Sequence, residues 1–230
     1  MRILAIVPAR GGSKGIKDKN IIRISGKPLI SYTIDLSIVL IKRKLIAKAI
    51  LSSDSEKIIQ VAKKQGLEVP FRRPKKFASD RSKAIEYILH AIEYFENRGE
   101  KFDSVLILQP TSPLRNVRDV TAAINLFIRS RTNSLISVYK EEYINELVMY
   151  KMKNKGKVGV PLNKDHSKGV RRQEHGSTYV RNGCIYLTKV SYLKRFNQLI
   201  SPNPVLYEMP KRRSINLDTP EDLSILKKLI

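Results

Sequence analysis

The chain of 230 residues is long enough for one domain with its own hydrophobic core, and a hydrophobic content of 42% excludes disorder as its default state. A single cysteine, Cys184, excludes an intramolecular disulfide and any Cys-x-x-Cys zinc or redox site. The formal net charge of +23 implies an anionic partner, but lysine and arginine are scattered along the whole chain, so charge alone does not identify that partner.

Short apolar runs alternate with helical patterns over the first two-thirds of the chain. The runs that are typical of buried strands are residues 3–7, 48–52, 105–108 and 134–138. Apolar residues at helical spacing predict helices over residues 28–40, 55–65, 83–97 and 117–128. This alternation predicts an α/β fold with a mostly parallel twisted sheet flanked by helices on both faces. In such sheets, ligands bind at the carboxyl ends of the strands.

The pattern changes between about residues 141 and 178. The stretch "MYKMKNKGKVGV" predicts a polar hairpin, and "PLNKDHSKGVRRQEHGS" predicts a long irregular connection of the kind that often binds a ligand or a partner. Regular structure returns with a strand in "YVRNGCIYLTKV" and a helix after "LDTPED". The chain has no internal repeat and no clear linker, so we expect a single domain over residues 1–230 with an inserted excursion at about 141–178.

Glycines and positive charges gather directly after the first predicted strand, in "VPARGGSKGIKDKN". This is not a P-loop, because Ile16 follows Gly15, and it does not supply the Gly-x-Gly-x-x-Gly dinucleotide pattern. Glycines in this place still let backbone N–H groups approach an anion, and Arg10, Lys14 and Lys19 add charge. The stretch therefore predicts an anion-binding loop.

Seven blocks of the sequence, in this order, resemble those of one enzyme family. They are "VPARGGSKGIKDKNI", "ISGKPLISYTI", "LSSDSEKI", "RRPKKFASD", "LILQPTSPLR", "YVRNGCIY" and "INLDTPEDL". Their content and order resemble the acylneuraminate cytidylyltransferases, which are the CMP–sialic acid synthetases and their legionaminic and pseudaminic acid relatives. The resemblance implies a Rossmann-like fold of the nucleotide-diphospho-sugar transferase type, with an excursion that takes part in dimerisation.

The activity implied by the resemblance is transfer of CMP from CTP to the anomeric hydroxyl of a nonulosonic, sialic acid-like 2-keto sugar acid, with release of pyrophosphate. Positioning and charge stabilisation dominate nucleotidyl transfer of this kind. By resemblance, Lys19 assists the α-phosphate and the leaving group, and Arg10 and Lys14 act with it as catalytic cations. The nucleotide-binding positions implied in the same way are Arg10, Gly11, Ser13, Lys14, Lys19, Arg73 and Asp80.

The resemblance also implies a sugar-binding set. Its members are Gln109, Arg172, Gln173, Asn182 and Tyr186. The Gln109 amide can both donate to and accept from a sugar hydroxyl. A guanidinium such as that of Arg172 binds a carboxylate through two hydrogen bonds, although the neighbouring Arg171 could take this role. Tyr186 could instead be a packed aromatic residue, and Arg115, after "QPTSPL", could be a surface charge at a helix start.

One position departs from the family pattern. Family members commonly have Asp-x-Asp near the carboxyl terminus for Mg²⁺, whereas this chain has Asn216 in the first place and Asp218 in the second. An asparagine oxygen can ligate a hard cation but adds no charge. We therefore expect Asp218 to be the main ligand of Mg²⁺ or Mn²⁺ and Asn216 a weaker one. Asp218 could alternatively cap the last helix, whose first turn holds Pro220, and an inactive homologue is a further alternative.

The expected partners are CTP and a nonulosonic acid, with a homodimer implied by the excursion. The related cytidylyltransferase for 3-deoxy-manno-octulosonate is one alternative. A basic nucleic-acid-binding protein is another, disfavoured because no basic strand or helix carries interleaved aromatics. The apolar part of residues 1–12 is too short for a signal peptide, and no stretch approaches the ~18 apolar residues of a membrane span. We therefore expect a cytoplasmic protein with no membrane partner.

Overall fold

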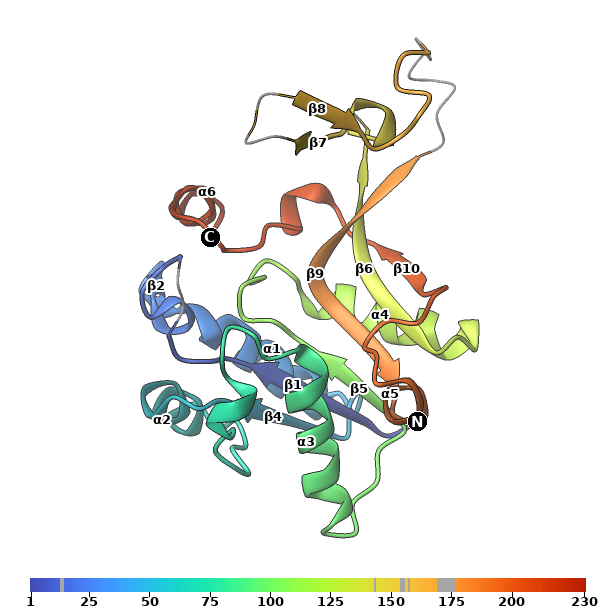
Figure 1. Ribbon diagram of the computed structural model, residues 1–230. Helices are drawn as coiled ribbons and strands as arrows, with labels where there is room; N and C mark the ends of the chain where they lie inside the picture. The colour runs from blue at the N-terminus through green and yellow to red at the C-terminus, as the bar shows by residue number, and fades with distance from the viewer. Residues whose placement is uncertain (13–14, 143, 154–155, 157, 169–176) are drawn as a thin grey trace.

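A twisted sheet forms the centre of the protein in a computed structural model, which describes residues 1–12, 15–142, 144–153, 156, 158–168 and 177–230 (Figure 1). Within these residues the sheet has six strands in the order β10-β6-β9-β5-β1-β4. The strands are β1 (Ile3–Pro8), β4 (Lys48–Ser52), β5 (Ser104–Ile107), β6 (Ser134–Glu141), β9 (Thr178–Lys189) and β10 (Val205–Glu208). Strand β1 runs parallel to β4 and β5, and β10 runs parallel to β6, whereas β9 is antiparallel to β5 and β6.

Helices cover both faces of this sheet because alternate residues of β1 point to opposite sides. Ile3, Ala5 and Val7 belong to a core cluster with α1, α2 and α4, whereas Leu4 and Ile6 join a second cluster with α3 and α5. The helices are α1 (Leu29–Lys42), α2 (Glu56–Lys64), α3 (Ala84–Glu96), α4 (Val117–Ser130), α5 (Val190–Phe196) and α6 (Pro220–Leu229). Among the described residues, no helix combines the length and the apolar character needed to cross a bilayer.

The expected α/β fold, with a mostly parallel sheet and helices on both faces, is confirmed. The first four predicted strands and the first four predicted helices are all present, with ends that shift by three residues at most. The sequence did not predict α5, β10 or the two short strands β2 (Arg23–Ile24) and β3 (Lys27–Pro28). These elements contain only two to seven residues each, which is too short for a periodic pattern to show.

The excursion contains a second small sheet, in which β7 (Tyr150–Lys153) pairs antiparallel with β8 (Val158–Pro161). It lies beyond the ends of β6 and β9 that point away from the helices α3 and α5, as the upper part of Figure 1 shows. A short 3-10 helix, η3 (Glu146–Val148), precedes it. The polar hairpin expected in "MYKMKNKGKVGV" is therefore present.

Three chain segments meet at the carboxyl ends of β1 and β5. The loop after β1 leads into the 3-10 helix η1 (Lys19–Ile21), and the loop after β5 leads into α4. The third segment, residues 214–219, connects the 3-10 helix η5 (Lys211–Arg213) to α6 and has no regular secondary structure. It joins the β5 loop because the Leu217 N–H donates to the Thr111 carbonyl at 2.8 Å, and the Leu217 side chain is buried with Ile24 and Leu29.

Candidate active site

Two hydrogen bonds hold the ends of the loop after β1 in place. The Gly11 N–H donates to Asp54 Oδ1 at 2.9 Å, and Asn20 Nδ2 donates to the Arg10 carbonyl at 3.1 Å. Between these contacts Gly12 has a φ of 66°, in the left-handed region that glycine adopts without a Cβ penalty. Within the described residues, these contacts hold Gly11 and Asn20 at the two sides of the loop, with Arg10 at the carboxyl end of β1.

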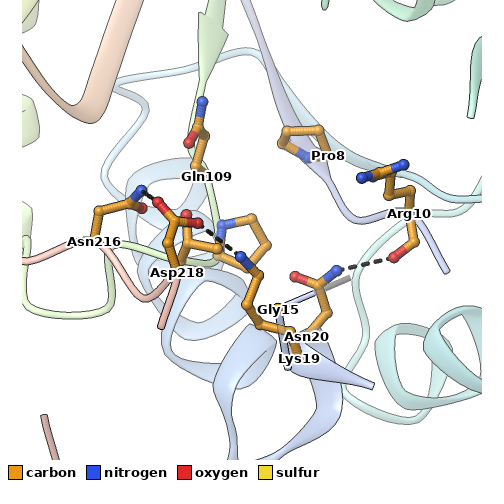
Figure 2. A pocket seen from close by; sticks show the side chains of 10 residues that line it. Pro8, Arg10, Gly15, Lys19, Asn20, Gln109, Asn216 and Asp218 are labelled. Carbon is orange, nitrogen blue, oxygen red and sulfur yellow. Dashed lines mark hydrogen bonds and ion pairs between the residues drawn. The ribbon is translucent and has the colours of Figure 1, made fainter. Parts of the chain in front are cut away.

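A cavity of about 350 Å³ opens between this loop, the β5 loop and the segment before α6 (Figure 2). Its lining residues are Pro8, Arg10, Gly15, Lys19, Asn20, Gln109, Pro110, Thr111, Asn216 and Asp218. The fold thus brings together five residues that we predicted for the site, from positions as far apart in the chain as Arg10 and Asp218. Its place at the carboxyl ends of β1 and β5 is the place where open α/β sheets bind ligands.

Lysine and carboxylate meet at the wall of this cavity. Lys19 Nζ lies 2.8 Å from Asp218 Oδ1, and the Asn216 amide donates to the other oxygen of the same carboxylate (Figure 2). The Lys19 side chain is only 16% exposed, whereas that of Asp218 is 60% exposed. Figure 2 shows Arg10 across the cavity from these groups. The arrangement offers cations for an anionic ligand and one accessible carboxylate for a metal ion.

Gly15 lets the β1 loop approach the segment before α6 very closely. A Cβ at this position would lie 2.6 Å from the Asp218 carbonyl oxygen, which is closer than real Cβ contacts occur. Gly15 is not among the glycines with a positive φ, so it is the contact rather than the backbone angle that requires glycine here. The loop and the Asp218 segment therefore form one continuous wall of the cavity.

The turn into α6 shows whether Asp218 is a helix cap. The cap is Thr219, whose side chain accepts from the Asp222 N–H, and Pro220 is the first residue of the helix. Asp222 Oδ2 in return accepts from the N–H groups of Asp218 and Thr219, at 2.9 and 2.8 Å. Burial acts to raise the pKa of Asp222, but these hydrogen bonds outweigh it and lower the pKa. The capping alternative for Asp218 is therefore wrong, and its carboxylate is available to the cavity.

A second cavity of about 280 Å³ adjoins the first. It is lined by Pro8, Arg10, Arg73, Phe77, Ser79, Asp80, Ser82, Ala84 and Tyr87. Arg10 and Pro8 border both cavities, and Arg10 Nη1 lies 2.5 Å from Asp80 Oδ1. One arginine therefore stands between two spaces that together could hold an elongated ligand with a charged middle.

Arg73 is a buried cation at the edge of the second cavity. Its Nε donates to Ser52 Oγ at 2.9 Å, its Nη2 donates to the Ser52 carbonyl, and its guanidinium lies 4.3 Å from the centre of the Tyr87 ring. Burial lowers the pKa of Arg73 and raises the pKa of Tyr87 to about 12. A buried guanidinium held from behind in this way is suited to present its remaining donors to a ligand.

Two of the predicted sugar-side residues, Gln109 and Tyr186, lie close to Gly183. A Cβ at Gly183 would lie 3.6 Å from Gln109 Oε1 and 3.9 Å from the Tyr186 hydroxyl. Burial raises the pKa of Tyr186, which is only 8% exposed. Gln109 lines the first cavity and Tyr186 does not, so Gln109 is the residue of this pair that can contact a ligand there.

Asn182 lies away from both cavities and bonds to protein groups. Its side-chain oxygen accepts from Ser137 Oγ at 2.6 Å and from the Cys184 N–H at 3.1 Å, and its nitrogen donates to Ser214 Oγ at 2.8 Å. Four further predicted residues, Ser13, Lys14, Arg172 and Gln173, lie outside the described residues.

Arg115 has a different environment from the one that the sequence indicated. The alternative that Arg115 is a surface charge at a helix start is wrong, because the residue is only 4% exposed. Its Nη1 donates to the Gln109 and Ser112 carbonyls at 2.7 and 3.0 Å, and its Nη2 donates to Thr33 Oγ1 at 2.6 Å. Burial lowers its pKa to about 10. Arg115 therefore fixes the β5 loop that carries Gln109 into the cavity.

The donor groups of the first cavity meet only part of what Mg²⁺ or Mn²⁺ needs. Among the described residues, no group of three or more His, Cys, Asp or Glu could hold a metal ion. The cavity supplies one carboxylate, from Asp218, and one amide oxygen, from Asn216. Mg²⁺ is usually bound by one or two carboxylates together with substrate phosphates and water. The residues therefore fit a metal ion that arrives with a phosphorylated ligand, rather than one held by protein groups alone.

The open α/β sheet with a cationic cavity at the carboxyl ends of its strands defines a protein of the doubly wound class that binds a ligand at this edge, and the charges of Arg10 and Lys19 suit an anionic ligand. The sequence profile of the cytidylyltransferase family matches residues 4–229. The chain therefore belongs to the cytidylyltransferase family.

Relatives and solved structures of similar proteins agree with this membership. The chain is 32% identical to the pseudaminic acid cytidylyltransferase of Campylobacter jejuni, in an alignment that covers 100% of this chain and 96% of that protein. It is 29% identical to the CMP-N,N'-diacetyllegionaminic acid synthase of Legionella pneumophila, over 100% and 97% of the two chains. The fold matches that of a CMP:2-keto-3-deoxy-manno-octonic acid synthetase complexed with CTP, with a TM-score of 0.70 and 17% identity over 100% and 98% of the chains.

Proposed function

We propose that the protein transfers CMP from CTP to the anomeric hydroxyl of a nonulosonic acid. The hydroxyl oxygen forms a bond to the α-phosphorus, the bond between the α- and β-phosphates breaks, pyrophosphate leaves and the hydroxyl proton is released. The proposal is supported by the family membership and by relatives of nearly equal length that are named for pseudaminic and legionaminic acid. Among the structural observations, the one that carries it is the cavity that joins Arg10, Lys19 and Asp218 to Gln109.

The two adjoining cavities suggest how CTP lies. The base and ribose occupy the cavity beside Arg73, and the triphosphate lies past Arg10 toward Lys19 in the larger cavity. The cations Arg10 and Lys19 bind phosphate oxygens, and Lys19 stabilises the charge that develops on the leaving pyrophosphate. The Gly11 N–H, which donates to Asp54, holds the loop in place beside the phosphates. Ser13 and Lys14, in the same loop, stay predictions for the triphosphate.

We expect the metal ion to bind together with the triphosphate. Asp218 and the Asn216 oxygen would hold Mg²⁺ or Mn²⁺, which supplies positive charge to the phosphates when bound. In the structure the Lys19 ammonium forms an ion pair with Oδ1 of Asp218. Lys19 thereby keeps this carboxylate in place and compensates its charge before nucleotide arrives.

The sugar acid lies on the β5 side of the cavity. Gln109 orients a hydroxyl or amide of the sugar, with Tyr186 behind it, and Arg172 with Gln173 stays our prediction for the carboxylate and its surroundings. CTP and the sugar acid are both anions, which suits a chain with a net charge of +23.

The exposed hairpin supports the proposal of a homodimer. Cross-strand pairs of β7 and β8 place Tyr150 opposite Pro161 and Met152 opposite Gly159, which makes one face of the hairpin free of charge. Met152 is 77% exposed on this face. Exposed apolar side chains that gather on one face, beside charged neighbours, are typical of an interaction surface. We expect Met152→Glu to shift the protein toward monomer in light scattering, while Lys151→Glu, on the opposite face, does not.

The activity is tested by pyrophosphate release. The protein is incubated with Mg²⁺, each of the four nucleoside triphosphates and a panel of acids: pseudaminic, legionaminic, N-acetylneuraminic and 3-deoxy-manno-octulosonic. We expect turnover with CTP and a nonulosonic acid. Lys19→Ala should lower the rate by about 10²–10³-fold, as loss of a transition-state donor does. Lys17→Ala, an exposed lysine of the same loop, is the matched control. Turnover with the octulosonic acid alone, or with no acid, would refute the proposed substrate class.

A further inference from the structure

The segment that carries Asn216 and Asp218 has no helix or strand to hold it. Residues 214–218 run between η5 and α6 without regular secondary structure. Asp218 follows Arg213 by five residues, a length of chain that can span ~17 Å when extended. Functional groups have to be held to within about 0.5 Å of their working positions. The position of this segment therefore depends on its contacts with the elements around it.

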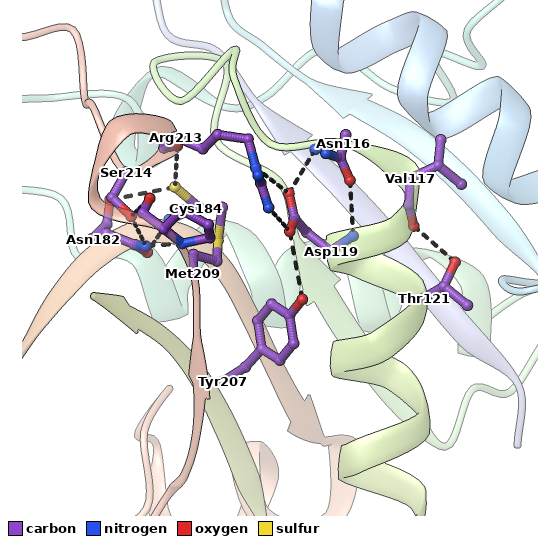
Figure 3. A network of polar contacts seen from close by, with 11 residues as sticks. Asn116, Val117, Asp119, Thr121, Asn182, Cys184, Tyr207, Met209, Arg213 and Ser214 are labelled. Carbon is purple, nitrogen blue, oxygen red and sulfur yellow. Dashed lines mark hydrogen bonds and ion pairs between the residues drawn. The ribbon is translucent and has the colours of Figure 1, made fainter. Parts of the chain in front are cut away.

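An ion pair between Arg213 and a buried carboxylate attaches the start of the segment to the core. Arg213 Nη2 lies 2.6 Å from Asp119 Oδ1, and Arg213 Nε donates to Asp119 Oδ2 at 3.2 Å (Figure 3). The Asp119 side chain is only 3% exposed. The two parallel contacts fix the direction of the guanidinium as well as its place, which a single contact would not do.

Asp119 is itself held in position by groups from two other elements. At the start of α4 its carboxylate accepts from the Asn116 N–H at 3.0 Å, as one half of a capping box. On the other side the Tyr207 hydroxyl, from β10, approaches its Oδ1 at 3.5 Å. The Asp119 carboxylate that binds Arg213 is therefore held in place by contacts with both α4 and the sheet (Figure 3).

Two further contacts continue this anchoring toward the cavity. The Ser214 hydroxyl, next to Arg213, accepts from the Asn182 side chain of β9 at 2.8 Å, and the Leu217 N–H donates to the Thr111 carbonyl at 2.8 Å. The segment is thus held at its start by side chains, near its end by the β5 loop and at Asp218 by the Asp222 carboxylate. Arg213 is the anchor that a substitution can remove without touching the cavity, because it is not among the lining residues.

We propose that the Asp119–Arg213 ion pair is a positioning device that sets where Asp218 presents its carboxylate to the metal-bound triphosphate. The proposal rests on the proposed function for the identity of that ligand. Residues that orient a metal ligand from outside the coordination sphere typically change metal affinity or activity by about 10–100-fold when they are substituted. The pair therefore acts on the metal and nucleotide requirement, rather than on stability alone.

The test compares Arg213→Met and Arg213→Lys with Arg212→Met, an exposed arginine of the same short helix. The Mn²⁺ concentration that gives half-maximal pyrophosphate release is measured for each. We expect it to rise about 10-fold or more in Arg213→Met, to return part of the way in Arg213→Lys and to stay unchanged in Arg212→Met. If Arg213→Met does not fold, Arg213→Lys and Asp119→Asn decide the question. A folded Arg213 variant with lower stability and an unchanged Mn²⁺ requirement overturns the proposal.

A second readout does not depend on turnover. Hydrogen exchange at the Leu217 amide should be faster in Arg213→Met than in Arg212→Met, and the affinity for Mn²⁺ with CTP, measured by titration calorimetry, should fall. If the wild-type protein releases no pyrophosphate with any sugar acid, the proposed function fails. The calorimetric comparison then still decides whether the ion pair positions Asp218, and equal affinities in the two variants refute it.

Discussion

Replacing Gly15 with alanine shows whether the β1 loop and the Asp218 segment have to touch for activity. The added Cβ would meet the Asp218 carbonyl oxygen at 2.6 Å, whereas ordinary contact begins at 3.4 Å, so the two segments have to separate by about 0.8 Å. The obstacle is backbone and cannot rotate away. A misplacement of ~1 Å in a site costs about 10²-fold in rate. We therefore expect kcat/KM for CTP to fall by about 10–100-fold.

The assay is pyrophosphate release at varied CTP, together with the melting temperature of each variant. Gly26→Ala is the control, because Gly26 has a φ of 77° and a Cβ added there would have no other atom within 4 Å. That substitution should cost ~1–2 kcal/mol of stability through the left-handed backbone and leave kcat/KM unchanged. If Gly15→Ala retains the wild-type kcat/KM, the close approach is not needed for catalysis and the reasoning is wrong.

Three further outcomes are expected. Asn216→Asp adds a second carboxylate beside Asp218, so it should lower the Mg²⁺ concentration needed for half-maximal activity; an unchanged requirement would exclude residue 216 from the metal site. Arg115→Met leaves the Gln109 carbonyl without its donor and should lower the free energy of unfolding by about 1–3 kcal/mol in urea titrations, whereas an unchanged midpoint would contradict a structural role. The pKa of Asp222 is lowered in the folded protein from an ordinary value of 3.8. Its contribution to stability is therefore complete above that pH and is lost as the pH falls through the folded value, a loss that Asp222→Asn should remove from the acid unfolding curve.

The main elements of the fold could be predicted because their signals are local. The buried strand β1 is a continuous apolar run, and helices such as α4 repeat apolar residues at helical spacing. The antiparallel direction of β9 could not be predicted, because it depends on how far the excursion carries the chain before it returns. Nothing in the apolar pattern of β9 records its direction.

The candidate site was predictable where residues follow strand ends, and was not where distant residues pair. Arg10 and Lys19 were found because they follow β1 directly, with glycines between them. Arg115 was misjudged because its partner Thr33 lies 82 residues away and no local pattern marks a buried arginine. The roles of Asp54, which accepts from Gly11, and of Asp119, which accepts from Arg213, were missed for the same reason.

The buried thiol of Cys184 can report local opening of the structure around β9. It is the only thiol in the chain, it is fully buried in β9, and burial raises its pKa. A thiol-specific reagent will therefore modify the native protein only when β9 transiently separates from its surroundings. The rate of that modification, compared with and without CTP, measures whether nucleotide lowers the frequency of this opening, and it requires no introduced label.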